Sequence, residues 1–581
     1  MIHLKQLLAA FAVALCVPQA AEAVKAYPRP ITVTQPDGTT VTVRIHGDES
    51  FHYVTTIDGF LLDKDKAGYF CYVDYDFTTG RKTITKQRAH NVGERNSAEK
   101  TLVAGLKAAK LVNADIKARR PVTVKQHKRV LKTGRKANGA MKAKAANQAE
   151  SQYLVILVNF KDCAFKYGQS DFETWLNEPG YSTNGGTGSV KDYWRDNSMG
   201  QFVPNFQVVG PYTLSQNQVY YAGNSEDTGE DANPRDMVKE ACQLAKAANP
   251  GLDFSQFDND GDGVVDNCYI IYAGYSEAST ANADDMWPHS WTMGDDVFEI
   301  DGVQIDEYSC SAELVGMPGY PETPTMDGIG TFTHEFGHIL GLKDMYDTDD
   351  YTNGYGVDPG AYSLYASGSY NNDSRTPPYL MAFERLQMGW AVEGTDIVEL
   401  KDPEDVTLDN VSTNKARYIN AQPGREEGTG YEWFVLENRQ QTGWDRYIPA
   451  HGLLIYHYDY TDEMREEYWD VNGPNNNAKH RCMYIKAADG VDDENSRAGD
   501  TYPGTSANTE FTDTSTPNSL NWNNEPTGVP VTNITEQDGM IRFQVSGGTS
   551  TWDFVKTNVP SDVRDVTATF VGEMTGNTQA V

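Results

Sequence analysis

The stretch Thr333–Asp344, THEFGHILGLKD, carries two histidines four residues apart, with a glutamate directly after the first. Side chains four apart are neighbours on an α-helix, so His334 and His338 can bind one metal ion. At 100° per residue, the opposite side of this helix is apolar and is expected to pack into a core. That apolar side consists of Ile329, Phe332, Phe336, Ile339 and Leu340.

Two imidazoles leave a zinc ion incompletely coordinated. Gly341 stands where the helix should end, and glycine there permits the left-handed turn that reverses the chain. Asp344 can then return a carboxylate as the third ligand, leaving a fourth position for water. Glu335 is expected to take the proton of that water as general base. The alternative is an amphipathic helix with two unrelated surface histidines.

Composition sets broad limits on the class of protein. The chain has 581 residues, 39% of them hydrophobic, which indicates a soluble globular protein with more than one domain. Its net charge of −33 argues against non-specific binding to nucleic acid, because phosphate backbones repel such a surface. The sequence assigns no pairing to the six cysteines that follow residue 23.

The first 23 residues have the pattern of a cleavable signal peptide. Lys5 gives the positive start, Leu7–Val17 is an apolar run too short to span a bilayer, and Ala21–Ala23 fits a small-x-small cleavage site. We expect export with cleavage after Ala23, to a secreted, periplasmic or surface-associated location. Lipidation at Cys16 is the less favoured alternative. No later apolar stretch predicts a membrane anchor.

A basic stretch interrupts this acidic chain. Residues 101–150 contain 13 Lys and Arg, are rich in alanine and lack aromatic residues, which predicts an exposed segment that proteases cut easily. One interpretation is a solvated linker. The other is a processing region, cleaved near Arg119-Arg120 or Arg135-Lys136, that releases an enzyme beginning near Ser151.

Residue patterns on either side of this stretch differ. Before it, Asp37-Gly38 between Val/Thr-rich runs predicts a β-hairpin. After it, apolar runs at Tyr153–Phe160 and Asn267–Gly274 predict buried strands, and Asn233-Pro234 predicts the start of a helix. Beyond 396, runs such as Gly452–Tyr460 predict a β-sandwich. We therefore expect a signal peptide (1–23), a small β-rich propeptide (24–105), a basic linker (106–150), an α/β (α+β) catalytic domain (151–395), a β-sandwich (396–547) and a carboxy-terminal extension (548–581).

A second candidate metal site lies in DNDGDGVVD, residues 258–266, which has the spacing of a calcium loop. Gly263 occupies the position of the sharp turn. Tyr269 stands where an EF-hand has its last glutamate, so a further carboxylate has to come from elsewhere. A solvated acidic turn is the alternative. The expected calcium ligands are the carboxylates of Asp258, Asp260, Asp262 and Asp266 and the main-chain carbonyl of Val264.

The motif HExxHxxGxxD resembles that of the immune inhibitor A family of secreted bacterial zinc metallopeptidases. Further stretches similar to that family are Gly188–Leu214, Phe257–Gly274, Met286–Trp291 and Glu437–Tyr460. Residues near Pro36 to Phe60 are similar to its propeptide. The resemblance implies a zincin or metzincin-like catalytic domain, an endopeptidase with one catalytic zinc, and a latent precursor inhibited by its own propeptide.

Two features leave alternatives open. Such enzymes usually place a methionine in a tight turn beneath the metal, whereas Tyr365 aligns there and Met381 lies further on. Tyr365 or Tyr370 is a candidate to hydrogen-bond the oxyanion, or both are ordinary packing residues. Cys71 is the only propeptide thiol and a candidate to block the zinc as thiolate. It equally fits the core of a strand, with an aspartate or the main chain blocking the cleft.

Two other functions compete with a protease. One is a calcium-stabilised adhesin whose zinc is structural, which the open coordination position and Glu335 argue against. The other is a zinc hydrolase acting on sugars or esters, which the helix motif and propeptide-like region disfavour. Protein or peptide substrates are therefore expected, but the sequence gives no cleavage preference.

Overall fold

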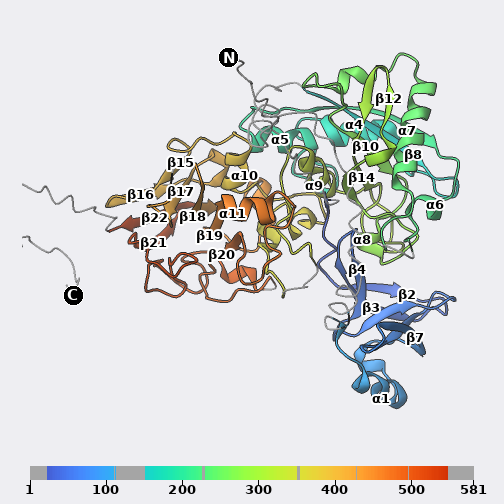
Figure 1. Ribbon diagram of the computed structural model, residues 1–581, viewed down its shortest axis with the longest axis horizontal. Helices are drawn as coiled ribbons and strands as arrows, with labels where there is room; N and C mark the ends of the chain where they lie inside the picture. Colours follow the sequence, from blue (N-terminus) through green and yellow to red (C-terminus); the bar gives the residue numbers. More distant parts are fainter. Residues whose placement is uncertain are drawn as a thin grey trace, which may run out of the picture.

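The computed structural model describes residues 22–109, 112, 151–225, 229–349, 354–426, 428–494 and 496–546. The predicted signal peptide up to residue 21, nearly all of the basic linker and the carboxy-terminal extension lie outside these ranges. Figure 1 shows three groups of sheets: a blue amino-terminal group, a teal-to-green central group and an orange carboxy-terminal group. None of the helices described is long and apolar enough to cross a membrane.

The amino-terminal group is one antiparallel sheet whose six strands follow chain order. The predicted hairpin at Asp37-Gly38 joins its first two strands, and Gly38 adopts a φ of +84°, which glycine tolerates without strain. Helix α1 (Ser97–Gly105) follows the sheet. The strands are β2 (Ile31–Thr34), β3 (Thr40–Gly47), β4 (His52–Thr56), β5 (Leu61–Lys64), β6 (Phe70–Asp76) and β7 (Arg81–Arg88).

The central group is a six-stranded mixed sheet in the order β1-β11-β14-β10-β8-β9. Its last four strands are mutually parallel, and β11 and β1 continue it in antiparallel fashion. The edge strand β1 comes from the amino-terminal segment, which the blue ribbon carries from β2 towards α9 (Figure 1). The strands are β1 (Glu22–Ala23), β8 (Gln152–Asn159), β9 (Asn205–Thr213), β10 (Cys268–Tyr272), β11 (His289–Thr292) and β14 (Glu307–Ala312).

Strand β8 is buried on both faces, as its continuous apolar run predicts. Leu154, Ile156 and Val158 belong to a core that also contains residues of α7 (Pro234–Ala248). The alternate residues of β8 face a second core, shared with helices on the other side of the sheet. Those helices are α4 (Gln169–Asn177), α5 (Val190–Asn197) and α9 (Ile329–Ile339).

Helix α7 begins at Pro234, as predicted, and the apolar side with Val238, Ala241, Cys242 and Ala245 is buried. The side chain of Asn233 does not cap it, but donates a hydrogen bond to the main-chain oxygen of Tyr220. The predicted strand at Tyr153–Phe160 is observed as β8, which begins and ends one residue earlier, and that at Asn267–Gly274 as the shorter β10.

The carboxy-terminal group has two sheets, one of five strands and one of three. Phe434 and Ile455 of the first sheet and Leu408 and Phe543 of the second belong to one hydrophobic core. The five-stranded sheet contains β15 (Ile397–Glu399), β17 (Ala416–Asn420), β18 (Gly430–Arg439), β19 (Gly452–Thr461) and β20 (Met483–Ile485). The three-stranded sheet contains β16 (Glu404–Leu408), β22 (Met540–Val545) and β21 (Val531–Gln537).

The remaining elements are short. Among them, β12 and β13 form a hairpin, and the others are single turns of helix. They comprise η1 (Val92–Glu94), η2 (Thr183–Gly185), α6 (Gln218–Ala222), η3 (Phe254–Phe257), α8 (Glu277–Thr280), η4 (Gly294–Asp296), β12 (Phe298–Ile300), β13 (Val303–Ile305), η5 (Gly360–Tyr362), η6 (Ser367–Tyr370), α10 (Ala382–Gln387), η7 (Val411–Thr413), η8 (Gly443–Tyr447), α11 (Asp462–Met464), η9 (Arg465–Trp469) and η10 (Arg497–Gly499).

Candidate active site and metal centre

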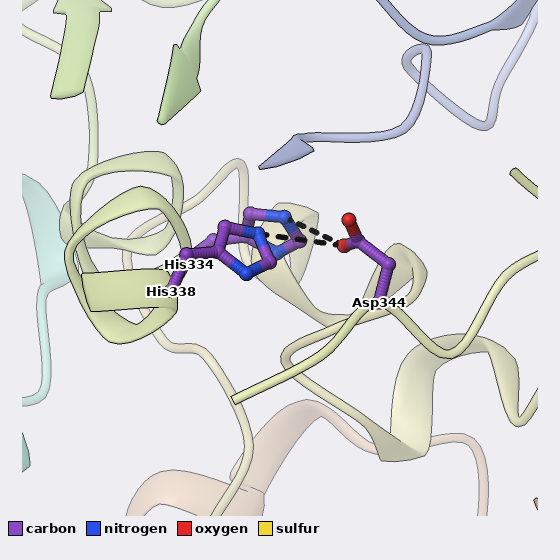
Figure 2. A group of neighbouring side chains, drawn as sticks. All are labelled: His334, His338 and Asp344. Atoms are coloured by element: carbon purple, nitrogen blue, oxygen red, sulfur yellow. Dashed lines mark ion pairs between the residues drawn. The ribbon is translucent and has the colours of Figure 1, made fainter. Parts of the chain in front are cut away.

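Helix α9 carries the central motif. Its apolar side packs as predicted: Phe332 and Phe336 are fully buried against aromatic residues of the core. Gly341 adopts a φ of +100° just after the helix, the left-handed turn that its position predicts. This turn brings Asp344 back to the histidines on the opposite side of the helix (Figure 2).

His334, His338 and Asp344 form a compact, buried group. Figure 2 shows both imidazoles directed at the carboxylate, whose Oδ1 lies 3.1 Å from His334 Nε2 and 3.5 Å from His338 Nε2. The three donor atoms all lie within 4.8 Å of one another. One histidine pair from a helix and one carboxylate from the following turn therefore converge on a single point.

The surrounding hydrogen bonds leave the metal-facing atoms unused. Each imidazole pairs through Nδ1 with a main-chain oxygen, that of Leu364 or Leu342, at 2.9 Å. Both Nε2 atoms and Asp344 Oδ1 are buried and have ion-pair contacts with one another but no hydrogen bond. Buried polar atoms normally have partners, so this donor set fits a missing cation such as zinc.

A residue far along the chain orients the Asp344 carboxylate. Asn472 donates from Nδ2 to Asp344 Oδ2 at 2.7 Å and accepts from the Asp344 main-chain N–H at 2.8 Å. Asp344 is thereby held with one oxygen turned towards the histidines. Sequence spacing gives no signal for Asn472, because 128 residues separate it from its partner.

In this group, burial and the neighbouring charges shift the pKa values in opposite directions. Burial alone lowers the pKa of His334, but the nearby Asp344 carboxylate outweighs it and raises that pKa to about 9. Burial raises the pKa of Asp344, yet the two histidines hold it below its usual range. For His338 burial prevails and lowers the pKa. Without a metal, the site thus attracts one positive charge.

The cleft beside these residues contains a stretch of the chain itself. Strand β1 pairs antiparallel with β11, so that Glu22 and Ala23 lie opposite Ser290 and His289. Directly after it, the Val24 N–H donates to Glu335 Oε1 at 2.7 Å. Burial raises the pKa of Glu335 well above its usual range, and its Oε2 has no hydrogen-bond partner.

Three further side chains bind the main chain of this stretch. Tyr346 donates its hydroxyl hydrogen to the Ala23 carbonyl oxygen. Trp287 Nε1 donates to the Val24 carbonyl oxygen at 2.9 Å, and the Tyr370 hydroxyl donates to that of Lys25 at 2.6 Å. A cavity of about 610 Å³ continues the cleft beyond Tyr27. The peptide bond between residues 23 and 24 therefore lies between Tyr346 and Glu335.

Comparison with known proteins identifies the central part of the chain. Residues 142–391 match the model of the catalytic domain of the immune inhibitor A peptidases, family M6. This segment is similar to that family. The sequence-based resemblance is confirmed, and the match supports the predicted class of enzyme, a metalloendopeptidase.

Two curated relatives of this M6 segment illustrate the similarity. Immune inhibitor A of Bacillus thuringiensis subsp. alesti is 32% identical over 202 residues, covering 31% of this chain and 28% of that protein. The pre-pro-metalloprotease PrtV of Vibrio cholerae serotype O1 (strain M66-2) is 28% identical over 285 residues, covering 42% of this chain and 31% of that protein. The matched regions thus span less than a third of each relative.

The structure assigns different places to the two predicted tyrosines of the M6 segment. Tyr365 lies beneath the histidines, its ring centre 5.1 Å from that of His334 and 5.2 Å from that of His338. Its hydroxyl lies against helix α9 at Gly337, where an added Cβ would be 1.7 Å away. Tyr370 contacts the peptide at Lys25. Tyr346, which sequence reasoning missed, is the tyrosine at the peptide bond itself, and its place two residues after Asp344 was an available signal.

Cys71 lies in β6 of the amino-terminal sheet. It is buried, faces Asp63 and Arg88 on the neighbouring strands, and burial raises the pKa of its thiol. The structure brings Glu22–Lys25, and not this thiol, to the metal-binding residues. This placement matches the alternative interpretation of Cys71 as a core residue of a strand.

The acidic loop brings together three of its four carboxylates. Asp258, Asp260 and Asp262 have ligand oxygens within 4.8 Å of one another. Asp266 is buried, and its Oδ2 accepts hydrogen bonds from the main chain and side chain of Asn259 instead. The Val264 N–H donates to Asp262 Oδ1 at 3.0 Å. Asp266 therefore orders the loop and is not part of the cluster.

Proposed function

We propose that this protein is a secreted, zinc-dependent endopeptidase that is made as a latent precursor. One observation is the main support for this proposal. Two imidazoles and a carboxylate converge, their buried donor atoms form no hydrogen bonds, and they lie directly beside a glutamate that contacts a peptide amide. His334, His338 and Asp344 would hold the zinc. When bound, zinc would acidify a water molecule and polarise the carbonyl of the bond to be cut.

The protein's own side chains provide the rest of the chemistry. Glu335 would accept the proton of the attacking water and pass it to the departing amine, and Val24 N marks the place of that amine. Tyr346 would donate its hydrogen bond to the carbonyl oxygen as negative charge develops there. Trp287 and Tyr370 would hold the part of the substrate that follows the cut.

The mode of binding favours peptides over other substrates. The outer side of β11 pairs with an extended main chain, that of β1. The three side-chain donors, Tyr346, Trp287 and Tyr370, each bind a main-chain carbonyl of this segment. Sugars and simple esters lack this repeating pattern. An adhesin with a structural zinc has no need of a buried general base beside a peptide bond. Proteins or peptides are accordingly the proposed substrates.

Latency would follow from the segment that occupies the cleft. Residues 24–27 cover the catalytic group from Glu335 to the start of the cavity, and the antiparallel sheet that follows anchors them. Signal cleavage after Ala23 would leave the Val24 amine beside Glu335. We therefore propose residues 24–105 as propeptide, 106–150 as the region cut on activation, 151–395 as catalytic domain and 396–547 as a β-sandwich, with 548–581 as an extension.

Calcium is proposed for the loop at residues 258–262. Its three neighbouring carboxylates would repel one another without a cation, and hard oxygen donors in this spacing suit calcium. Such an ion would stabilise the turn that leads into β10, the strand at the centre of the catalytic sheet.

The test uses the processed protein and casein. We expect cleavage that a zinc chelator abolishes and added zinc restores, and no cleavage by Glu335→Ala, which should still bind one zinc and melt like the parent. Exposed Glu510→Gln is the control and should remain active. A fully active Glu335→Ala enzyme would overturn the proposed mechanism, and a wild-type enzyme indifferent to zinc would overturn the proposed function.

A further inference from the structure

The side chain of Lys25 enters an acidic pocket beside the catalytic cleft. Its Nζ lies 2.8 Å from Asp358 Oδ2, 3.0 Å from Glu494 Oε2 and 3.3 Å from the Tyr355 hydroxyl. The Lys25 side chain is only 15% exposed, and Asp358 is fully buried. Two carboxylates and a hydroxyl thus surround one ammonium group.

The pocket joins two distant parts of the chain. Asp358 follows the zinc-binding turn and is fixed through Oδ1 by the Gly360 N–H at 2.7 Å. Glu494 belongs to the carboxy-terminal region and hydrogen-bonds the Tyr355 hydroxyl. Burial raises the pKa of Asp358, and the Lys25 ammonium opposes that rise. The two carboxylates are therefore held in place by the protein and form a site that favours a cation.

The nearest permanent cation, Arg497, meets that need only in part: its charge acts on both carboxylates, but its guanidinium hydrogen-bonds other groups. Arg497 donates to the main-chain oxygen of Asp358, not to its carboxylate. Its guanidinium pairs instead with Asp500 at 3.1 Å and lies 3.6 Å from Asp492. When the amino-terminal segment leaves, Asp358 and Glu494 lose the ammonium that faces both of them, and a buried carboxylate without a counter-charge is costly.

The register fixes where this pocket lies on a substrate. The bond between Ala23 and Val24 lies at Glu335 and Tyr346, so Lys25 is the second residue after the position of cleavage. Its main-chain carbonyl is held by Tyr370, which aims the side chain from a defined point. The chain runs antiparallel to β11, as an extended peptide bound at this edge would.

We propose that Asp358 and Glu494 form a specificity pocket that selects substrates with lysine or arginine two residues after the cut bond. This inference rests on the proposed peptidase function and adds the substrate class to it. The ammonium of Lys25 is the model for the bound group, and its charge-assisted hydrogen bonds are the source of selectivity. The basic region 101–150, with 13 Lys and Arg, would offer many such bonds to the enzyme itself.

The first test measures binding without catalysis. The processed enzyme, stripped of zinc in calcium buffer, is titrated calorimetrically with the peptides Val-Lys-Ala-Tyr and Val-norleucine-Ala-Tyr, the first copied from residues 24–27. We expect the lysine peptide to bind about 10- to 100-fold more tightly, as for a largely buried ion pair. Equal affinity of the two peptides would overturn the pocket whether or not the protein is a protease.

The second test uses the zinc-loaded enzyme and fluorogenic peptides that differ only at this position. We expect kcat/KM to be about 10- to 100-fold higher for lysine than for norleucine. Glu494→Gln and Asp358→Asn should each reduce this ratio at least threefold, because each removes one of the two charges that face the lysine. Both variants retain an acceptor oxygen, so the loop that Asp358 supports keeps its hydrogen bond.

Glu463→Gln serves as the control, because this carboxylate lies in α11 and pairs with Arg425. It should leave the lysine-to-norleucine ratio unchanged. Cleavage of both peptides at equal rates would overturn the pocket but leave the proposed function standing. Lysine-dependent binding without cleavage of any peptide would overturn the proposed function and leave the pocket.

Discussion

At the scale of single residues, the candidate site depends on which atoms have no other partner. His334 and His338 use Nδ1 for main-chain oxygens, so only Nε2 remains for a ligand. Glu335 is engaged by Val24 through one oxygen only. Tyr346 has the most direct position for catalysis after Glu335, because its hydroxyl contacts the carbonyl of the same peptide unit.

Tyr346→Phe should lower kcat about 100-fold and leave KM nearly unchanged, since the lost hydrogen bond strengthens as the oxyanion forms. Steady-state kinetics on the processed enzyme measures this effect. Affinity for a phosphinic peptide inhibitor should fall in parallel, while zinc content and melting temperature stay the same. Tyr220→Phe removes an exposed hydroxyl as control. Unchanged kcat with faster activation of the precursor would mean that Tyr346 only holds the propeptide.

At the scale of elements, helix α9 is positioned by close backbone contacts. A Cβ on Gly330 would lie 1.8 Å from the main-chain oxygen of Ser369 in η6, and one on Gly328 would lie 2.1 Å from the Ser374 main chain. The helix therefore meets the following loops at a distance that only glycine permits.

Gly330→Ala should destabilise the protein by about 3 kcal/mol, because backbone has to move to admit the methyl group. Thermal and denaturant melts measure the change, and zinc affinity should fall with it as the helix shifts. Gly105→Ala is the matched control: no atom lies within 4 Å of its Cβ, so it should be neutral. A Gly330→Ala protein as stable as the parent would show that α9 and η6 are not packed this closely.

The acidic loop makes a prediction about metal removal. A calcium-selective chelator should lower the melting temperature by several degrees, and calcium but not zinc should restore it, since the carboxylates repel one another when the ion is gone. Asp260→Asn should reduce the response to chelator, whereas Asp402→Asn, an exposed carboxylate outside the loop, should not. Identical melting curves with and without chelator would contradict a calcium site.

At the scale of the whole molecule, buried charges join the catalytic and carboxy-terminal regions. Arg439 of β18 pairs with Asp445 at 2.6 Å and donates to main-chain oxygens of Tyr362 and Tyr379. Glu384 lies at the same junction, where its Oε2 accepts from the Met381 N–H at 2.7 Å. Glu437 completes the contact by accepting from the first residue of α10. Such groups are costly to leave uncompensated.

This junction predicts a pH dependence of stability. Burial raises the pKa of Glu384 from an ordinary value of 4.5 to about 8. The folded protein therefore binds this proton more tightly than the unfolded chain, so its contribution is complete below pH 4.5 and is lost as pH rises through about 8.

Glu384→Gln replaces the carboxyl by a neutral side chain of the same shape, so the fall in melting temperature between pH 5 and pH 9 should become shallower. Melting temperatures of both proteins across this range measure the difference, which corresponds to a few kcal/mol at pH 9. Exposed Glu510→Gln should leave the pH profile unchanged. A variant whose profile parallels the parent would show that Glu384 is ionised in the folded protein at neutral pH.

Local sequence patterns were sufficient to predict the structure wherever residues that are neighbours in the sequence are also neighbours in space. The spacing of His334, His338 and Gly341 predicted a helix, its apolar side and the turn after it, because a helix repeats every 3.6 residues. The continuous apolar runs at β8 and β10 predicted buried strands, because such a strand has apolar neighbours on both faces. The acidic loop shows the limit: spacing placed Asp266 among the ligands, whereas a hydrogen bond to Asn259 turns it away.

The sequence by itself predicted the helix with its two histidines, the adjacent glutamate and the resemblance of the central segment to the immune inhibitor A peptidases, since each rests on residues a few positions apart. Only the tertiary structure decided which tyrosine meets the peptide bond, that Asn472 orients Asp344, and that Cys242 and Cys268 lie 3.3 Å apart. It also showed that Lys25 bridges Asp358 and Glu494, which stand 333 and 469 residues away. The physical reason is chain folding over long separations: such contacts depend on how the sheets pack, and no local periodicity encodes them.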